Sequence, residues 1–355
     1  IDYRQTAPAA ATRDMFLDAK GEPDNFKSRD SGLSVGVPGT VRGLALAHEK
    51  YGSGRFTLSQ LVEPAVRLAR EGIPVEEDLA DSLPAAAPRF AKHPASAAIF
   101  LKDGKALKRG DLLVQSDLAL TLEAIRQQGP DAFYAGRIAG QIAAAVRGAG
   151  GVMTEGDLAA YKPVLRPVVR GSYRGYEIAS MPPPSSGGVH LVEILNILEG
   201  FDLKAMGAGS AGALHVMAEA MKPAYADRAS FLGDPDRVKV PVKGLTAKAY
   251  AAPLRAAIEP QRARKADEIK AGDPLPHESD QTTHFSVLDK DGNAVSNTYT
   301  LNFSYGMAMV AAGTGVLMNN EMDDFSAKSG AQNAYGLVGG DTNSVHPGAR
   351  PLSSM

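Results

Sequence analysis

The sequence predicts an α+β fold, because its first two-thirds and its last part follow different periodicities. Up to about residue 228, apolar residues recur at three- and four-residue spacing, as on the buried face of a helix. From Thr282 onward, apolar and polar residues alternate as in strands. Between them lies a charged, proline-containing stretch, residues 259–281, that has neither period and is predicted to be a flexible linker. Helical and strand segments are thus segregated along the chain, which is typical of α+β proteins.

Individual helices and strands can be placed by their boundary residues. Thr57 and Gln60 have the spacing of a capping box, so a helix is predicted to begin after Thr57. Another helix is predicted after Pro38-Gly39-Thr40. Further helices are expected at Asp117–Gln127, Arg137–Val146, Val189–Leu198 and Ala211–Ala226, and short strands at Val168–Tyr173 and Tyr176–Ser180.

Residues 283–302 have the pattern of a β-hairpin. The five residues Asp289–Asn293 supply the turn, and Asp291-Gly292 is its strongest part. With this loop, Leu288 faces Ala294 across the hairpin. A shift by one residue would turn every side chain to the opposite face, so this register is a specific prediction.

The same register, counted back along the first arm, places Thr282 opposite Thr300, with Asn302 diagonally within reach. A threonine hydroxyl becomes an effective nucleophile when a base removes its proton, and the α-amine of a chain-terminal threonine can be that base. An internal Thr282 gains such an amine only if the Gln281–Thr282 bond is cut. On spacing alone, the alternative is a threonine-rich edge strand that follows a surface linker.

Composition argues against several other classes of protein. The chain of 355 residues has 38 Lys and Arg against 40 Asp and Glu, so no basic excess favours nucleic acid. It has no cysteine, which excludes thiol nucleophiles and Cys-ligated metals. Its seven histidines lack metal-ligand spacing, and no apolar run approaches the roughly 18–20 residues that span a bilayer. We therefore expect no metal, no cofactor and no membrane span.

Several long motifs resemble the γ-glutamyltransferase family. The longest, SDQTTHFSVLDKDGNAVSNTYTLNFSYG, is similar to the junction between the large and small subunits of that family. Others are NNEMDDFS, NAYGLVGG and RPLSSM downstream, and YRQTAPAAATRDMF, GVPGTVRG, SMPPPSSGGVH and AYADR upstream. They occur in collinear order over essentially the whole chain.

The resemblance implies a four-layer αββα sandwich of the N-terminal nucleophile hydrolase type. It also implies autocatalytic cleavage at Gln281–Thr282, which would divide the chain into residues 1–281, a mainly helical large-subunit portion, and 282–355, the β-rich start of a small subunit. The two products would form a heterodimer. The reaction implied is transfer of a γ-glutamyl group from glutathione or another γ-glutamyl amide, through an ester on Thr282, to water or to an amino acid or peptide. Bacterial members are commonly periplasmic or secreted.

Roles at the nucleophile and the substrate ammonium are carried over by the same resemblance. Thr282 matches the nucleophile, and Thr300 matches the threonine that hydrogen-bonds it. Asn302, Glu321 and Asp324 match the residues that hold the α-ammonium of the substrate. Chemically this is consistent, because two carboxylates and an amide oxygen can accept from three N–H donors. Without the motif, Glu321 and Asp324 could simply cap a turn.

A second group of matches concerns the α-carboxylate of the substrate. Arg4 matches the arginine that binds this carboxylate, and Ser353 and Ser354 match the serine pair that adds hydrogen bonds to it. Tyr335 matches the tyrosine of a lid loop. Taken singly, Arg4 could be a terminal surface arginine, the serines an ordinary loop dipeptide, and Tyr335 a packed aromatic residue.

Two alternatives remain open. A cephalosporin acylase uses the same threonine chemistry on a glutaryl side chain, which lacks the α-ammonium. The chain could instead be an unprocessed, inactive fragment. The resemblance implies sequence on both sides of this chain, including a glycine pair beyond Met355 that forms the oxyanion hole, so we expect a longer protein.

Overall fold

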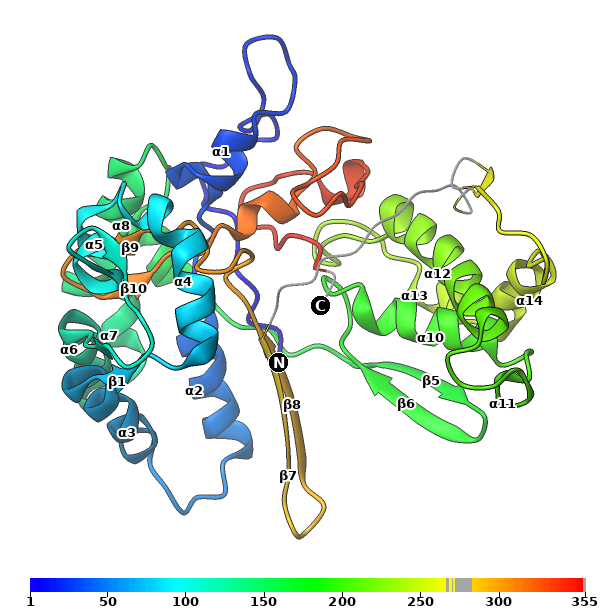
Figure 1. Cartoon of the computed structure of the whole chain (residues 1–355), viewed down its shortest axis with the longest axis horizontal. Helices are drawn as coiled ribbons and strands as arrows, with labels where there is room; N and C mark the ends of the chain where they lie inside the picture. Colours follow the sequence, from blue (N-terminus) through cyan, green and yellow to red (C-terminus); the bar gives the residue numbers. More distant parts are fainter. Residues whose placement is uncertain (266–267, 270, 272–282, 354–355) are drawn as a thin grey trace. The chain divides into compact units, whose positions relative to one another are not determined.

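The computed structural model describes residues 1–265, 268–269, 271 and 283–353, which form two compact units (Figure 1). Unit 1 combines residues 1–16, 24–165 and 281–323, and unit 2 combines residues 17–23, 166–280 and 324–355. Each unit therefore draws on sequence from both sides of the Gln281–Thr282 bond. The division at that bond predicted above concerns covalent cleavage, and it stays a prediction.

The main core of unit 1 forms around α8 (Gly136–Gly148). Its residues Ile138, Ala139, Ile142, Ala143 and Val146 are all buried, and their spacing gives one continuous apolar face. This face packs in a cluster with Met307, Met309 and Met318, which flank the short antiparallel pair β9 (Val310–Ala311) and β10 (Val316–Leu317). Segments far apart in the sequence are thereby fixed in one core.

A second core of unit 1 is aromatic. Phe90 at the end of α4 (Glu77–Phe90) stacks on Phe100 at the end of α5 (Pro94–Phe100), with ring centroids 4.5 Å apart. Tyr305 meets Phe90 edge-on at 5.2 Å. Such pairs add to the hydrophobic stabilisation. Because Tyr305 packs into this core, the chain is anchored at that residue, two positions after Phe303.

The remaining elements of unit 1 are short helices and two-stranded sheets. Residues Glu321–Asp324 form the 3₁₀ helix η3, whose last residue is assigned to unit 2. The others are α1 (Asn25–Arg29), η1 (Gly32–Ser34), α2 (Thr40–Tyr51), α3 (Leu58–Glu71), α6 (Ser116–Gln128), α7 (Asp131–Tyr134), α9 (Glu155–Ala160), and the pairs β1 (Ile73–Pro74) with β4 (Leu112–Leu113) and β2 (Leu101–Lys102) with β3 (Lys105–Ala106).

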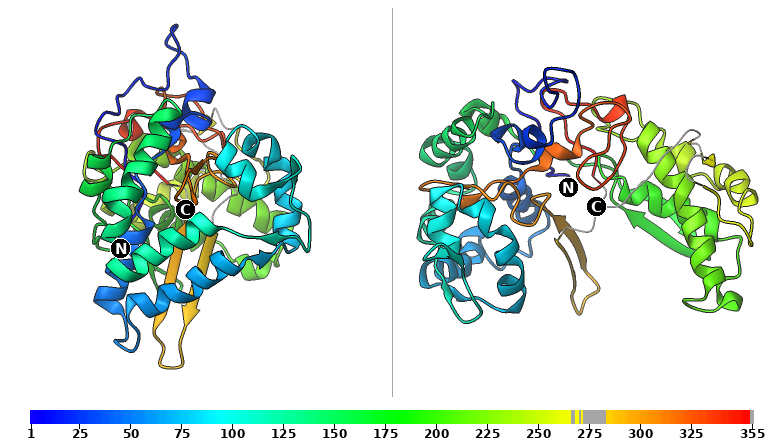
Figure 2. Two further views of the ribbon diagram at one scale, coloured as in Figure 1. Left: turned by 90° about the vertical axis from the view of Figure 1, so that its left-hand side faces the viewer. Right: turned by 45° about the horizontal axis from the view of Figure 1, so that its top comes forward.

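The predicted hairpin is confirmed in type and register. Strands β7 (Thr283–Leu288) and β8 (Ala294–Tyr299) pair antiparallel, with Leu288 opposite Ala294. Figure 2 shows them as a long two-stranded ribbon. Tyr3 ties this ribbon to the first residues of the chain, because its hydroxyl donates to Asn297 Oδ1 at 2.6 Å.

Unit 2 is built from the hairpin β5 (Val169–Tyr173) and β6 (Tyr176–Ser180) with the helices α10 (Gly187–Leu198) and α12 (Ala211–Phe231) (Figure 1). A Cβ at Gly171 would lie 2.5 Å from Val192 of α10, so the absence of a side chain there lets β5 approach the helix. The other elements of unit 2 are α11 (Leu203–Met206), α13 (Val242–Leu245), α14 (Lys248–Ala256) and η4 (Asp341–Asn343).

The predicted helices and strands agree with these elements. The helix predicted after Pro38-Gly39-Thr40 is α2, and Thr57 and Gln60 form the predicted capping box of α3. Helices were also predicted at the positions of α6, α8, α10 and α12, and strands at those of β5 and β6. Both helices and strands are present, so the predicted α+β class is confirmed.

Part of the stretch predicted to be a linker is held by α12. Arg264 forms an ion pair with the buried Glu219, with Nε and Oε2 2.6 Å apart, and its backbone N–H donates to the same carboxylate.

Among the described helices, none is long and apolar enough to cross a membrane.

Buried ionisable groups lie between α10, α12 and α14. The hydroxyl of Tyr250 donates to Asp227 Oδ2 at 2.6 Å. Burial, and then the Asp227 carboxylate, raise the pKa of Glu193 to about 10. Burial, and then the nearby Arg228, lower the pKa of His190 to about 3. Near neutral pH, Glu193 therefore carries a proton and His190 is uncharged.

We predict that Glu193→Gln flattens the pH dependence of unfolding. An unfolded glutamate loses its proton near pH 4.5, whereas folded Glu193 keeps its proton to about pH 10. Between these values the folded state holds one more proton, so this group lowers the free energy of unfolding by up to about 1.4 kcal/mol per pH unit as the pH rises. Glutamine mimics the protonated acid and removes this slope. Urea unfolding between pH 6 and pH 9 would measure the difference.

The matched control is Glu199→Gln. Contact with Lys248 lowers the pKa of Glu199, so that its contribution to stability is lost only at acid pH, below the range measured. The control should keep the wild-type slope. An unchanged slope in Glu193→Gln would contradict the protonated state of Glu193.

Candidate active site

A buried ion pair lies at the centre of the candidate site in unit 1. Arg4 Nη1 and Glu321 Oε1 are 2.6 Å apart, and the two side chains are only 5% and 1% exposed. Two hydrogen bonds hold the backbone of Arg4. Its N–H donates to Asp2 Oδ1, and its carbonyl accepts from the hydroxyl of Tyr161. Arg4 is therefore no surface arginine, which was the alternative considered from the sequence.

Glu321 is oriented by the residue two positions before it. Asn319 Oδ1 accepts from the backbone N–H of Glu321 at 3.0 Å and from that of Gly36 at 2.9 Å, while Asn319 Nδ2 donates to the Gly36 carbonyl. Asn319 thus pairs with both backbone groups of Gly36. The start of η3 is thereby held against a segment that is 283 residues away in the chain.

Asn302 is buried in the same unit. Its backbone N–H donates to Thr300 Oγ1 at 2.9 Å, and its side-chain Nδ2 donates to the carbonyl of Asn320 at 2.9 Å. The Thr300 carbonyl accepts from Gln5 Nε2 at 3.0 Å. Unit 1 therefore brings together Arg4, Thr300, Asn302 and Glu321 through a chain of direct contacts and neighbouring residues.

Asp324 and Tyr335, which belong to unit 2, both contact Asn333. Asn333 Oδ1 accepts from the backbone N–H groups of Tyr335 and Leu337 and so closes a tight turn. Asn333 Nδ2 lies 3.5 Å from Asp324 Oδ1. The side chain of Tyr335 is half-buried. The loop that carries the predicted lid tyrosine is thus tied to Asp324 by one asparagine.

Ser353 is also in unit 2 and is buried. Its backbone N–H donates to the Pro184 carbonyl at 2.8 Å, and its carbonyl accepts from both the backbone N–H and the hydroxyl of Ser186 at 2.8 Å. Arg228 Nε donates to the Ser186 hydroxyl at 3.3 Å. The main chain of Ser353 is therefore fixed beside the start of α10.

Three of the expected site residues, Gln281, Thr282 and Ser354, lie outside the described residues. Thr283 pairs with Tyr299, as the predicted register requires. The same register, continued by one residue, would place Thr282 opposite Thr300. The pairing of Thr282 itself stays a prediction.

The sequence interpretation overlooked Asn319, Asn320 and Asn333. All three are asparagines that hold other residues through their side chains or backbone. The first two directly precede Glu321 in the motif NNEMDDFS, and the third opens NAYGLVGG. Their place inside these motifs was the available indication, but their hydrogen bonds reach residues that no local pattern connects.

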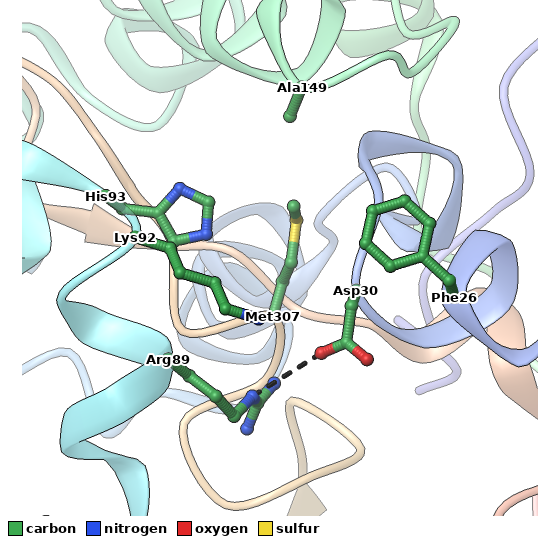
Figure 3. Close-up of a pocket in the computed structure, with 7 residues that line it drawn as sticks. All are labelled: Phe26, Asp30, Arg89, Lys92, His93, Ala149 and Met307. Carbon is green, nitrogen blue, oxygen red and sulfur yellow. Dashed lines mark ion pairs between the residues drawn. The ribbon is translucent and has the colours of Figure 1, made fainter.

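A pocket of about 220 Å³ in unit 1 is lined by Phe26, Asp30, Arg89, Lys92, His93, Ala149 and Met307 (Figure 3). None of these is an expected site residue. Among the lining residues, Arg89 Nε and Asp30 Oδ1 lie 3.6 Å apart, and Arg89 Nη2 also donates to the Gly306 carbonyl. Burial, and then Lys92 and Arg89, lower the pKa of His93. Arg89 thus connects the lining of this pocket to Gly306, which lies in the same loop as Asn302.

We predict that Arg4→Met destabilises the protein by about 3–5 kcal/mol, because it removes the cation that the buried Glu321 contacts. Chemical denaturation would measure the loss. The matched control is Arg13→Met, since Arg13 and Asp14 are 4.0 Å apart and both exposed, and such pairs contribute about 0–1 kcal/mol. Equal effects of the two substitutions would contradict a structural role for the Arg4–Glu321 pair.

Comparison with known proteins places the chain in a family. The family model described as gamma-glutamyltranspeptidase matches residues 1–355. The chain is 56% identical over 356 residues to the glutathione hydrolase proenzyme of Escherichia coli (strain K12), an alignment that covers 100% of this chain and 61% of that protein. It therefore spans about three-fifths of the length of this relative.

Solved structures agree with this assignment. Gamma-glutamyltranspeptidase from Helicobacter pylori matches with a TM-score of 0.74 and 44% identity, over 79% of this chain and 80% of that chain. Cephalosporin acylase from Bacillus halodurans matches with a TM-score of 0.82 and 27% identity, over 100% of this chain and 62% of that chain. These neighbours confirm the predicted N-terminal nucleophile hydrolase type of fold. The chain belongs to the gamma-glutamyltranspeptidase family.

Proposed function

We propose that the protein containing this chain is a γ-glutamyltransferase and glutathione hydrolase. The observation that carries the proposal is the buried Arg4–Glu321 pair, together with Asn302, which is bound to the residue directly before Glu321. Arg4 is a cation for an α-carboxylate, and Glu321 with the amide oxygen of Asn302 offers acceptors for an α-ammonium. This arrangement complements the amino-acid end of a γ-glutamyl group.

Charge balance supports the same substrate class. Arg4 and Glu321 neutralise each other within the protein. An α-amino acid head group carries one charge of each sign, so it can pair with both residues and leave the net charge of the site at zero. A head group with only a carboxylate would leave Glu321 without a matching charge, which is costly in a buried site.

The proposed reaction begins at Thr282. Its own α-amine removes the hydroxyl proton, and the oxygen attacks the γ-carbonyl carbon of the substrate. The C–N bond of the γ-amide then breaks, the departing amine takes up the proton, and a γ-glutamyl ester of Thr282 remains. Water or the amine of an amino acid or peptide attacks this ester and regenerates the threonine. We assign to Thr300 the hydrogen bond to the nucleophile.

The other expected site residues belong to unit 2. We assign Asp324 to the α-ammonium, Ser353 and Ser354 to the α-carboxylate, and Tyr335 to a lid over the bound substrate. The contacts of Asn333 with both Asp324 and the turn around Tyr335 support a common function for these two residues. Because bacterial members of the family are commonly exported, we propose a periplasmic or secreted location, which cell fractionation would test.

A second candidate is a cephalosporin acylase of the same fold. The structural match to the cephalosporin acylase from Bacillus halodurans over the whole chain favours it. A glutaryl substrate, however, has no α-ammonium and would not use the carboxylate of Glu321. The buried position of Glu321 therefore favours the γ-glutamyl substrate.

We predict that the full-length protein cuts itself at Gln281–Thr282. Intact mass should show two products that stay associated as a heterodimer, and sequencing of one should begin Thr-Thr-His-Phe. Thr282→Ala should remain a single chain without activity, because it lacks the hydroxyl that attacks. Thr283→Ala, one residue further on, is the control and should still be cut. A folded wild-type protein that stays uncut would leave an inactive relative as the better interpretation.

Substrate preference gives a second prediction. Glu321→Gln should lower kcat/KM for a γ-glutamyl anilide roughly 30-fold, the equivalent of about 2 kcal/mol for the loss of a buried charge partner. It should have little effect on a glutaryl anilide, which has no ammonium. Steady-state kinetics with both anilides would measure the two effects. A wild-type preference for the glutaryl anilide would instead support the acylase.

A further inference from the structure

The loop between β8 and β9, residues 300–309, carries Asn302 and has an unusual backbone conformation. Asn302 has φ +74°, Tyr305 has φ +66°, and Gly306 has φ +51°. Residues other than glycine rarely adopt the left-handed region, although asparagine tolerates it better than most. Such conformations cost free energy and persist only where neighbouring groups hold them. The contacts that fix this loop are therefore of functional interest.

Asn320 holds the start of this loop. Its backbone N–H donates to the Leu301 carbonyl at 3.0 Å, and its carbonyl accepts from Asn302 Nδ2 at 2.9 Å. Its side-chain Oδ1 accepts from the Phe303 N–H at 3.1 Å. Three consecutive residues, 301 to 303, are thus bound to one asparagine that is fully buried.

The side chain of Asn320 is anchored at its other end. Nδ2 donates to the carbonyl of Arg29 at 3.3 Å, and Arg29 in turn pairs with Asp323 of η3 at 3.2 Å. The amide of Asn320 therefore bridges two main-chain groups that lie far apart in sequence. An asparagine suits this position because it has one acceptor and one donor at the end of a short side chain.

These contacts decide how the amide of Asn302 is presented. Its Nδ2 is directed to the Asn320 carbonyl, so its acceptor oxygen is the end directed away from Asn320. An ammonium group needs an acceptor. The main-chain carbonyl of Asn320 therefore selects the orientation of Asn302 that suits the substrate, next to Glu321, the second acceptor. The side-chain bonds of Asn320 to Phe303 and Arg29 hold that carbonyl and the start of the loop in register.

The far end of the loop is held separately. Arg89, seen beside Asp30 in Figure 3, donates to the Gly306 carbonyl and lies 5.9 Å from the centre of the Phe303 ring. Loss of the Asn320 side chain should therefore loosen the start of the loop while Gly306 stays in place.

We propose that Asn320 is a positioning residue for recognition of the substrate α-ammonium, acting through Asn302. This proposal rests on the function proposed above, since it assumes that Asn302 meets the ammonium.

The test compares two anilides with Asn320→Ala in the full-length processed protein. Truncation removes the contacts to Phe303 and Arg29, so we expect KM for the γ-glutamyl anilide to rise roughly tenfold, in keeping with the loss of one or two buried hydrogen bonds. kcat should change less than about threefold, because the nucleophile is untouched. Turnover of the glutaryl anilide, which has no ammonium, should stay the same.

A double-mutant cycle identifies the route of the effect. If Asn320 acts through Asn302, then Asn320→Ala should raise KM little further in a protein that already carries Asn302→Ala. The matched control is Asn196→Ala in unit 2, because Asn196 is also buried and also donates to a distant carbonyl, that of Thr246. It should lower the melting temperature without altering the ratio of the two anilide rates.

Different results overturn different claims. Equal losses on both anilides, or fully additive effects of Asn302→Ala and Asn320→Ala, would reduce Asn320 to a purely structural role. A wild-type enzyme without any preference for the γ-glutamyl anilide would overturn the proposed function itself. If Asn320→Ala does not fold, the milder Asn320→Ser allows the same comparison of the two substrates.

Discussion

The buried contact between Arg4 and Glu321 is the interaction on which the candidate site depends. A guanidinium and a carboxylate that are both removed from water need each other, because either one alone would be strongly destabilising in the interior. This requirement draws the start of the chain to η3 and, through Gln5, to Thr300. The same two charges are those that an amino-acid head group would meet. In the proposed function, one pair of side chains would serve both stability and recognition.

Asparagines position candidate site residues in each of the two units. Asn319 holds Glu321 against Gly36, and Asn320 holds residues 301 to 303. In unit 2, Asn333 joins the turn around Tyr335 to Asp324. An amide side chain can donate and accept at once without carrying charge, so it can fix backbone segments near charged groups without disturbing the charge balance.

The sequence predicted local structure well because local structure depends on local patterns. The capping box at Thr57, the helix period of α8 and the turn chemistry of Asp291-Gly292 each act within a few residues, and each is present in the structure. The roles of Arg4 and Asn320 follow a different logic. Arg4 meets Glu321 across 317 positions, and Asn320 joins Arg29, 291 positions away, to residues 301 to 303. Spacing alone therefore gave Arg4 as a surface residue and gave no role to Asn320. Only the resemblance of whole motifs pointed to Arg4, and the hydrogen bonds of Asn320 required the folded chain.

The distance in sequence between Arg4 and Glu321 also bears on how the protein is made. The two residues are separated by 317 positions. At about 5–20 residues per second, a ribosome needs roughly 15–60 seconds to reach Glu321 after it has made Arg4. Throughout that time the guanidinium is without the carboxylate that later covers it. Unit 1 therefore stays incomplete until residues 283–323 have been made, and its early helices expose apolar surface that can aggregate during that interval.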